Sequence, residues 1–437
     1  MKAKNSLGLI FFPAFDWAIS PTHPEREERL LYTQDQIFEE GVEDIEGIHF
    51  FNPSLARPAD VQRVHFAYPD VESIVTESHF IAAGGMMRAL DAVMSKETDK
   101  AFAMVRPPGH HAQRVTYGDR GFCIINIEAV GLEYIRQKHP GLRIAIVDTD
   151  CHHGDGTQDI YWNDPDTLFI SFHQDGRTLY PGTGEMNELG GPGAYGYNLN
   201  IPLPPNTGDD GFLHVIDNVV LPVLDDYKPD LIINSAGQDN HYTDPLTNMN
   251  FSAQGYALLN EKLNPDVAVL EGGYSIEGAL PYVNLGIVLA MAGLDYSGVR
   301  EPDYHEAKWR QSLRVTRKVE EISQQVLKNW QNKEILAEKE FRGLRKVTLP
   351  RQVYYDTAGI METQQQEFKV CDDCSGVNTI RSVNDRGDSL IGVQIPRNTC
   401  PACHSEGYRL FEIASKAQVK RRFLQDKSSD QYFASTD

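Results

Sequence analysis

One short run of this sequence limits the possible folds more than any other: an apolar stretch that passes directly into a cluster of acids and histidines. Residues Leu142 to Val147 predict a buried strand of a parallel sheet. Acids and imidazoles crowded at a strand end are hard to explain as packing, and open parallel sheets bind ligands beyond the carboxyl ends of their strands. The run therefore predicts half of a metal site. Its polar members are Asp148, Asp150, His152, His153 and Asp155.

Four more apolar runs end in polar residues in the same way, so we expect them to supply the other half of the site. These runs cover residues 101–105, 167–172, 231–234 and 266–270. Helical segments alternate with the strands, for example over residues 78–94, 127–138 and 211–226. This alternation predicts an α/β fold, a parallel sheet flanked by helices, up to about residue 300.

Composition excludes several classes of protein. The 437-residue chain carries 41 basic and 62 acidic residues, a net charge of −21, which argues against nucleic acid or an anionic membrane as a general partner. No apolar run is long enough to span a bilayer. Residues Met1 to Ile10 predict a first strand rather than a signal peptide, so we expect a cytoplasmic protein.

The chain is expected to divide into four parts. Residues 1–347 form the catalytic domain and end in a charged helical region from residue 301. Residues 348–367, which are Gln-rich and contain Pro350 and Gly359, are expected as a linker. Residues 368–413 form a small domain, and residues 414–437 a polar, mobile tail. The helical region has a predicted buried stripe at Trp309, Leu313, Val319, Ile322, Val326 and Leu327.

Four cysteines form two CxxC pairs within the small domain. In a reducing compartment this spacing indicates a closed, structural zinc site, and the intervening residues predict a short hairpin, as in a zinc ribbon. Such a unit is too small to build a core without metal. Three roles stay open for it: binding a protein partner, self-association into a homo-oligomer, or covering the mouth of the substrate channel. The cysteines are Cys371, Cys374, Cys400 and Cys403.

Seven motifs, in order along roughly residues 9–300, resemble the zinc-dependent histone deacetylase family. The resemblance is closer to its class II and bacterial acetylpolyamine amidohydrolase branch than to class I. It implies an arginase–deacetylase fold with the site at the carboxyl edge of the sheet. The motifs are His23-Pro-Glu-Arg-Glu-Glu-Arg-Leu30, Arg106-Pro-Pro-Gly-His-His-Ala112, Gly121-Phe-Cys123, Val147 to Gly156, Tyr180-Pro-Gly-Thr-Gly184, Ser235-Ala-Gly-Gln-Asp239 and Gly272-Gly-Tyr274.

The resemblance implies that Asp150, His152 and Asp239 bind the catalytic metal. Three protein ligands leave a coordination position open for water, as in catalytic zinc sites. Since two of the three ligands are carboxylates, iron or cobalt could also bind there.

Acid–base residues are implied by the same resemblance. The tandem histidines His110 and His111 match the family's proton-transfer pair, with His111 the principal acid–base and His110 alternatively a structural hydrogen-bonding group. Asp148 and Asp155 match their respective carboxylate partners. Tyr274 matches the residue that donates a hydrogen bond to the developing oxyanion.

The family's remaining site residues are carried over in the same way. The aromatic side chains of Phe122 and Tyr180 suit the walls of a channel for the methylene chain of an acyl-lysine. The cation of Arg29 suits a channel through which acetate leaves, although Arg29 could equally form a salt bridge at the start of a helix. Potassium is a secondary expectation. The substrate channel is assigned to Gly121, Phe122, Tyr180, Gly272 and Gly273, the product channel to Arg29, and a potassium site to Asp148, Asp150, His152, Ser171 and Phe172.

We therefore expect a metal-dependent deacetylase that hydrolyses the amide of acetyl-lysine or a related N-acyl amine. Two alternatives remain compatible with the sequence: an acetylpolyamine hydrolase, and a catalytically idle module that binds acyl-lysine. A two-manganese ureohydrolase of the arginase type would need more bridging carboxylates than Asp150 and Asp239 supply. The acyl group, the substrate, the role of the ribbon and the oligomeric state stay open.

Overall fold

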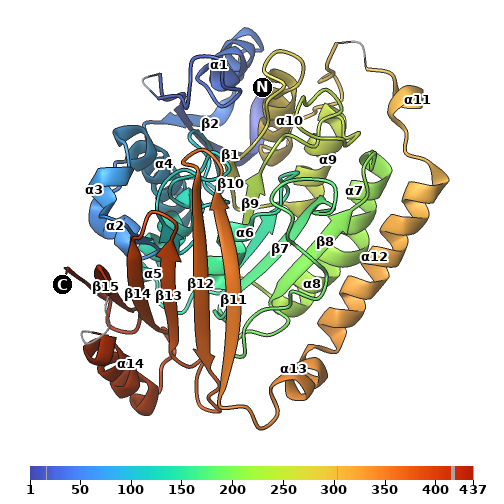
Figure 1. Cartoon of the computed structure of the whole chain (residues 1–437). Coiled ribbons are helices and arrows are strands. Elements are labelled where there is room, and N and C mark those ends of the chain that lie inside the picture. The colour runs from blue at the N-terminus through green and yellow to red at the C-terminus, as the bar shows by residue number, and fades with distance from the viewer. Residues whose placement is uncertain (16, 303, 415–418, 437) are drawn as a thin grey trace.

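The computed structural model of the chain describes residues 1–15, 17–302, 304–414 and 419–436. Its central element is an eight-stranded, all-parallel sheet (Figure 1) in the order β2-β1-β4-β10-β9-β6-β7-β8. The strands are β1 (Lys2–Phe12), β2 (Glu46–Phe51), β4 (Lys100–Val105), β6 (Ile144–Asp148), β7 (Thr167–Gln174), β8 (Asn198–Leu203), β9 (Leu231–Ala236) and β10 (Val267–Leu270).

The five predicted strand runs and the predicted N-terminal strand all lie in this sheet. Strand β6 is buried along its whole length between β9 and β7, which explains its uninterrupted apolar sequence. The α/β fold expected from the sequence is confirmed.

Side chains alternate between two cores, one on each face of the sheet. On β4, Ala101, Ala103 and Val105 pack with α4 (Glu77–Met94) and α5 (Ile127–Lys138). Phe102 and Met104 point to the opposite core. Helices contributing to that second core are α1 (Glu28–Glu39), α7 (Asp209–Val215), the π-turn η2 (Ile216–Val220), α8 (Leu221–Tyr227), α9 (Ala253–Leu263), α10 (Leu280–Met291) and α12 (Leu313–Gln331).

Short elements complete the catalytic part. They are the 3₁₀ turn η1 (Val42–Asp44), α2 (Pro58–Gln62), α3 (Val71–Ile74), α6 (Asp155–Tyr161), α11 (Glu306–Trp309), α13 (Lys333–Phe341) and the two-residue strands β3 (Phe66–Ala67) and β5 (Val115–Thr116).

The buried stripe of the charged helical region is shorter and further along than expected. Helix α12 buries Val319, Ile322, Val326 and Trp330, whereas Leu313 is 76% exposed. Ser312 caps the helix through the backbone N–H of Val315, so Leu313 lies in the first turn, before the helix reaches the core.

A second, six-stranded sheet follows the catalytic part. Its order is β11-β12-β13-β14-β15-β16, antiparallel except for the parallel pair β14 and β15, which α14 connects. The elements are β11 (Lys346–Tyr355), β12 (Ile360–Lys369), β13 (Asn378–Asn384), β14 (Ser389–Ile395), α14 (Pro401–Ala414), β15 (Arg421–Asp426) and β16 (Gln431–Thr436).

The predicted linker at residues 348–367 is wrong, because this stretch forms most of a long β-hairpin, β11 and β12. The inward positions of β12 include Glu362, Gln364 and Gln366, all buried. A strand with polar residues on its inward face lacks the apolar–polar alternation that would reveal it in a sequence.

The predicted mobile tail is also wrong over the part that is described. Residues 421–426 and 431–436 form the antiparallel pair β15 and β16, and Phe423 and Leu424 are buried. Residues 415–418 and 437 of that tail lie outside the described residues.

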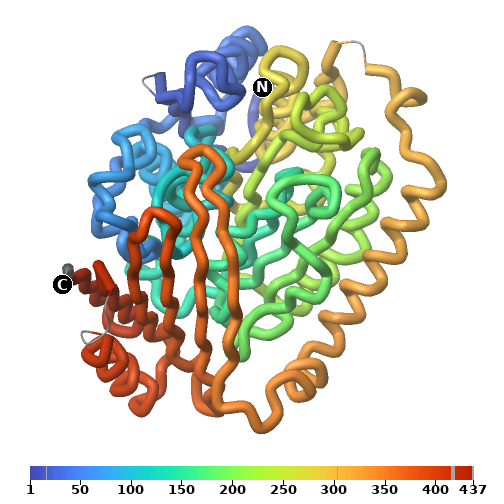
Figure 2. Tube along the Cα trace, viewed as in Figure 1, coloured from blue at the N-terminus to red at the C-terminus, as the bar shows by residue number. Residues whose placement is uncertain are grey.

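The second sheet packs against the catalytic part rather than forming a detached unit. Figure 2 shows its strands crossing in front of the catalytic chain. Phe66, Val115 and Tyr117 of the catalytic part share one apolar cluster with residues of the sheet, among them Tyr355 and Ile380. Across the described residues, no helix has the length and apolar character needed to cross a bilayer.

Candidate active site

The carboxyl ends of four neighbouring strands bring most of the candidate residues together. The loop after β4 carries His110 and His111, the loop after β6 carries Asp150 and His152, and Asp239 follows β9. Strand register places Asp148 beside Ser235 of β9 on one side and Ser171 of β7 on the other. The short loop after β10 leads to Tyr274.

Asp150, His152 and Asp239 present one ligand atom each within 4.8 Å of one another. His152 Nδ1 lies 2.8 Å from Asp239 Oδ2 and 3.3 Å from Asp150 Oδ1. Gly237 and Gly272 pack against these carboxylates so closely that a Cβ would approach Asp150 Oδ2 to 2.0 and 2.6 Å. Two buried carboxylates facing one imidazole nitrogen fit a divalent cation, which would compensate their charge.

The electrostatics of the ligand set also favour a cation. Burial alone would lower the pKa of His152, but Asp239 and Asp150 outweigh it and raise the pKa to about 10. The protein part of the site therefore attracts positive charge strongly.

The two adjacent histidines lie in opposite electrostatic environments. His110 Nδ1 lies 3.2 Å from Asp148 Oδ2, and His111 Nδ1 lies 2.9 Å from Asp155 Oδ1. Burial opposes the charged form of both. The carboxylates of Asp150 and Asp148 nevertheless raise the pKa of His110, whereas burial and the neighbouring His110 lower the pKa of His111 to about 3. His111 is therefore neutral, with Nδ1 oriented by Asp155 and Nε2 able to accept a proton.

Tyr274 is buried, and burial raises the pKa of its hydroxyl, so the group stays protonated and can donate a hydrogen bond. Its backbone N–H donates to Asp244 Oδ2 at 2.8 Å. Arg29 lies against the ring, 5.0 Å from its centroid. Arg29 is fully buried, pairs with Glu25 and donates to the carbonyls of Gly273 and Glu271, so it holds the loop that carries Tyr274.

Phe122 and Tyr180 lie beside catalytic residues: Phe122 beside Tyr274, and Tyr180 beside His111. The Phe122 ring is 5.6 Å from the Tyr274 ring, and the Tyr180 ring is 5.2 Å from that of His111. We call Phe122, Tyr180 and Tyr274 the aromatic rim.

The remaining sequence-predicted residues fall into two groups. Ser171 and Phe172 lie buried on β7 next to Asp148, where the potassium site was expected. The four cysteines lie far along the chain, beside the β13–β14 hairpin, with ligand atoms within 4.8 Å of one another. Their convergence fits a structural metal, and the hairpin between the CxxC pairs agrees with the predicted ribbon.

Sequence reasoning missed several buried partners of the site. Glu271 accepts hydrogen bonds from the backbone N–H groups of Gly109 and His110, and burial raises its pKa to about 8. Arg120 Nη1 donates to Asp155 at 2.8 Å. Both residues directly precede a motif identified in the sequence, and this position could have indicated that they belong to the site.

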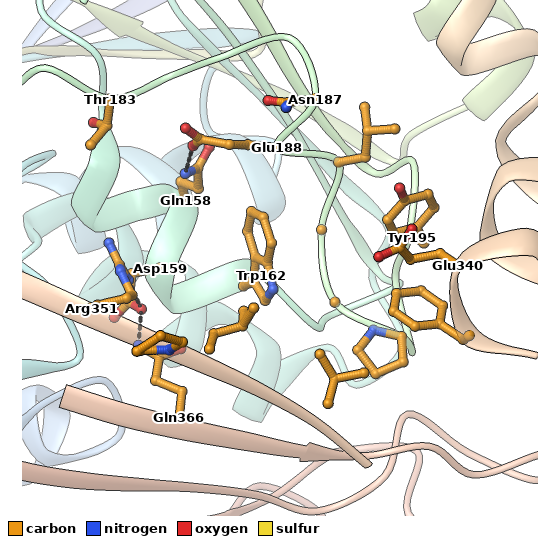
Figure 3. Close-up of a pocket in the computed structure, with 18 residues that line it drawn as sticks. Gln158, Asp159, Trp162, Thr183, Asn187, Glu188, Tyr195, Glu340, Arg351 and Gln366 are labelled. Carbon is orange, nitrogen blue, oxygen red and sulfur yellow. Dashed lines mark hydrogen bonds and ion pairs between the residues drawn. The ribbon is translucent and has the colours of Figure 1, made fainter. Parts of the chain in front are cut away.

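A separate cavity of about 400 Å³ lies between the catalytic part and the second sheet (Figure 3). Trp162 and Tyr195 contribute to one wall, and Arg351 and Gln366 to another. Gln158, which lines it, lies 3.2 Å from His153 Nε2, but none of the predicted metal or catalytic residues borders the cavity.

Comparison with known proteins places this geometry in a family. Residues 66–285 match the histone deacetylase domain. The chain is 45% identical over 344 residues to a probable deacetylase of Archaeoglobus fulgidus, an alignment covering 71% of this chain and 94% of that protein. It is 36% identical over 231 residues to a histone deacetylase-like amidohydrolase of Pseudomonas aeruginosa, covering 51% of this chain and 60% of the relative.

A solved structure agrees with the sequence matches. The crystal structure of the HDA15 HD domain superposes with a TM-score of 0.65 at 26% identity, covering 77% of this chain and 99% of that one. The chain belongs to the histone deacetylase family. Membership assigns it to the metal-dependent deacetylases, and a catalytically idle binding module is not favoured.

Proposed function

We propose that this chain is a zinc-dependent hydrolase that removes the acyl group from acetyl-lysine or a related N-acyl amine. The observation that carries the proposal is the convergence of Asp150, His152 and Asp239 beside His111, whose Nδ1 is engaged by Asp155. A zinc ion held by these three residues would supply an activated water and polarise the acyl carbonyl.

The protein groups supply the proton transfers and the orientation. His111 accepts the proton of the attacking water at Nε2, because its Nδ1 is engaged by Asp155. It then delivers that proton to the leaving amine nitrogen. His110, paired with Asp148, places positive charge near the developing anion.

Tyr274 donates its hydroxyl proton in a hydrogen bond to the carbonyl oxygen as negative charge develops there. Phe122 and Tyr180 hold the alkyl stem of the substrate between their rings. The channel glycines Gly121, Gly272 and Gly273 let the backbone pack closely against neighbouring side chains, among them His111 and the ligand carboxylates. Because the structure shows Arg29 engaged by Glu25 and two backbone carbonyls, we favour its structural role over a product channel.

Three further assignments belong to the same proposal. The four cysteines hold a second, structural zinc, and a four-thiolate site suits a reducing compartment such as the cytoplasm. Potassium binds near Asp148 and Ser171. The cysteine-bearing sheet offers a surface for a protein partner or for a second copy of the chain.

Zinc stoichiometry and turnover of an acetyl-lysine peptide, measured on one purified sample, test the proposal. We expect about two zinc ions per chain. Asp239→Ala should lose one zinc ion and all turnover, whereas Cys403→Ser should lose the other zinc ion. An acetylpolyamine, assayed in parallel, separates the two substrate classes. A wild-type protein that binds both ions and hydrolyses neither substrate would contradict the proposal.

A further inference from the structure

The turn of the β11–β12 hairpin reaches the loop that carries Phe122, one member of the aromatic rim. This turn, residues 356–359, is at the upper end of the two strands in Figure 1. The backbone N–H of Gly121 donates to Asp356 Oδ1 at 2.9 Å. A Cβ added to Gly118 would lie 3.4 Å from the Ala358 Cβ, so the turn also approaches the loop closely at this position.

The loop segment held by Asp356 has an uncommon backbone conformation. Gly121 has φ +56° and Phe122 has φ +67°, and a bulky residue in the left-handed region persists only where its surroundings hold it. Reciprocal backbone hydrogen bonds between Arg120 and Cys123, both 3.0 Å, close the turn from within. The Asp356 carboxylate holds it from outside.

Gly121 also lies directly against the catalytic groups. A Cβ at this position would come within 2.5 Å of His111 Cδ2 and 3.0 Å of the Tyr180 hydroxyl oxygen. The Phe122 ring contacts the His23 ring edge-on at 4.4 Å. A small displacement of Gly121 would therefore shift the neighbouring Phe122 and change the space beside His111.

The charge of Asp356 also acts on two neighbouring titratable groups, Asp119 and His23. Burial, and after it the charge of Asp356, together raise the pKa of Asp119 to about 7. The same carboxylate acts on His23, opposing the lowering of its pKa by burial. Asp356 thus acts on Asp119, in the same loop as Phe122, and on His23, whose ring contacts Phe122.

We infer that Asp356 is a positioning residue of the deacetylase site: its carboxylate holds the Gly121 N–H and thereby fixes Phe122 where the substrate stem must pass. The inference rests on the proposed function. The histone deacetylase match ends at residue 285, so this contact comes from a part of the chain that the match does not include. The second sheet therefore helps to hold a loop of the active site in place.

Three variants of the full-length chain test the inference. Asp356→Ala removes the acceptor, and Asp356→Asn keeps an oxygen acceptor while removing the charge. Asp385→Ala makes the same change at an exposed position on the adjacent β13–β14 turn. Each is assayed for kcat and KM on an acetyl-lysine peptide, for zinc content, and for hydrogen exchange of the amides in residues 118–124.

We expect Asp356→Ala to lower kcat/KM about fivefold, mainly through KM, with zinc content unchanged. Amide hydrogen exchange in residues 118–124 should become faster. Asp356→Asn should stay within about twofold of wild type, and Asp385→Ala should match wild type in both measurements.

The inference is overturned if exchange in residues 118–124 is unchanged in Asp356→Ala, or if Asp356→Asn is as impaired as Asp356→Ala. The exchange measurement does not depend on turnover. An inactive wild type would therefore count against the proposed function alone, while the exchange result would still decide whether Asp356 holds the loop.

Discussion

At the scale of single residues, two neighbouring histidines acquire different chemistry from their surroundings. His110 faces Asp148 and Asp150, whereas His111 faces Asp155, whose charge is already shared with Arg120. Consequently His110 favours the cationic form and His111 the neutral form. Sequence shows only two identical imidazoles side by side.

Tyr274→Phe is the sharpest test of a single catalytic group. The variant keeps the ring that packs against Phe122 and loses only the hydroxyl, so we expect intact folding and a fall in kcat of about a hundredfold. Kinetics on an acetyl-lysine peptide measure this. Tyr282→Phe, on α10 outside the candidate site, is the matched control. Unchanged turnover in Tyr274→Phe would rule out the oxyanion role.

At the scale of elements, β12 carries a buried polar face. Glu362 accepts hydrogen bonds from Gln364 and Ser382, and its Oε2 lies 2.9 Å from the Tyr355 hydroxyl. That hydroxyl also lies 2.9 Å from the Val115 carbonyl oxygen, and it has one proton to donate. If the Tyr355 hydroxyl donates its proton to the Val115 carbonyl, the Glu362 carboxyl must be protonated to complete the contact with Tyr355. This agrees with the effect of burial, which raises the pKa of Glu362 to about 7.

Glu362 should therefore make stability depend on pH. Because its pKa is raised from 4.5 to about 7, the folded state binds more protons, and this contribution to stability is lost as pH rises between those values. In Glu362→Gln the side-chain amide can donate to Tyr355 without titrating. We expect the variant to gain about 3 kcal/mol relative to wild type between pH 4.5 and pH 8.

Urea unfolding across this pH range measures the difference. Glu367→Gln, which removes only a surface pair with Lys346, should show no comparable slope. A pH-independent difference between Glu362→Gln and wild type would mean that Glu362 is ionised in the folded protein.

At the scale of the whole molecule, buried polar contacts join the two sheets. Arg114 is 1% exposed and donates to Asp159 of the catalytic part as well as to Asn378 and Gln366 of the second sheet. Arg351 of β11 pairs with the same aspartate. Because both parts share these ion pairs and hydrogen bonds, we expect the second sheet to stabilise the catalytic part against unfolding.

Arg114→Ala should lower the free energy of unfolding by about 2 kcal/mol, less than for an isolated buried pair because Arg351 still faces Asp159. All four tryptophans lie before residue 346, so guanidinium unfolding followed by tryptophan fluorescence reports on the catalytic part. Arg381→Ala, at an exposed position on β13, is the control. An unaltered midpoint in Arg114→Ala would show that the interface contributes little to that part.

The sequence by itself determined the parallel sheet, its strand ends and the residues gathered there. Buried parallel strands are apolar throughout, and polar residues at their ends stand out against them, so Asp150, His152 and Asp239 could be selected from pattern and resemblance. The two CxxC pairs were visible for the same reason, since metal ligands recur at short, fixed spacings.

Only the tertiary structure decided how residues 346–414 and 419–436 fold. The inward face of β12 is polar, so the sequence lacks the alternation that would predict a strand. The hydrogen-bonding partners of Gln366 on this face, Arg114 and Asp159, lie over 200 residues earlier in the chain. The contact between Asp356 and Gly121 likewise spans 235 residues and involves a backbone N–H, which every residue except proline carries. No local pattern encodes such a pairing, because it exists only once both sheets have folded against each other.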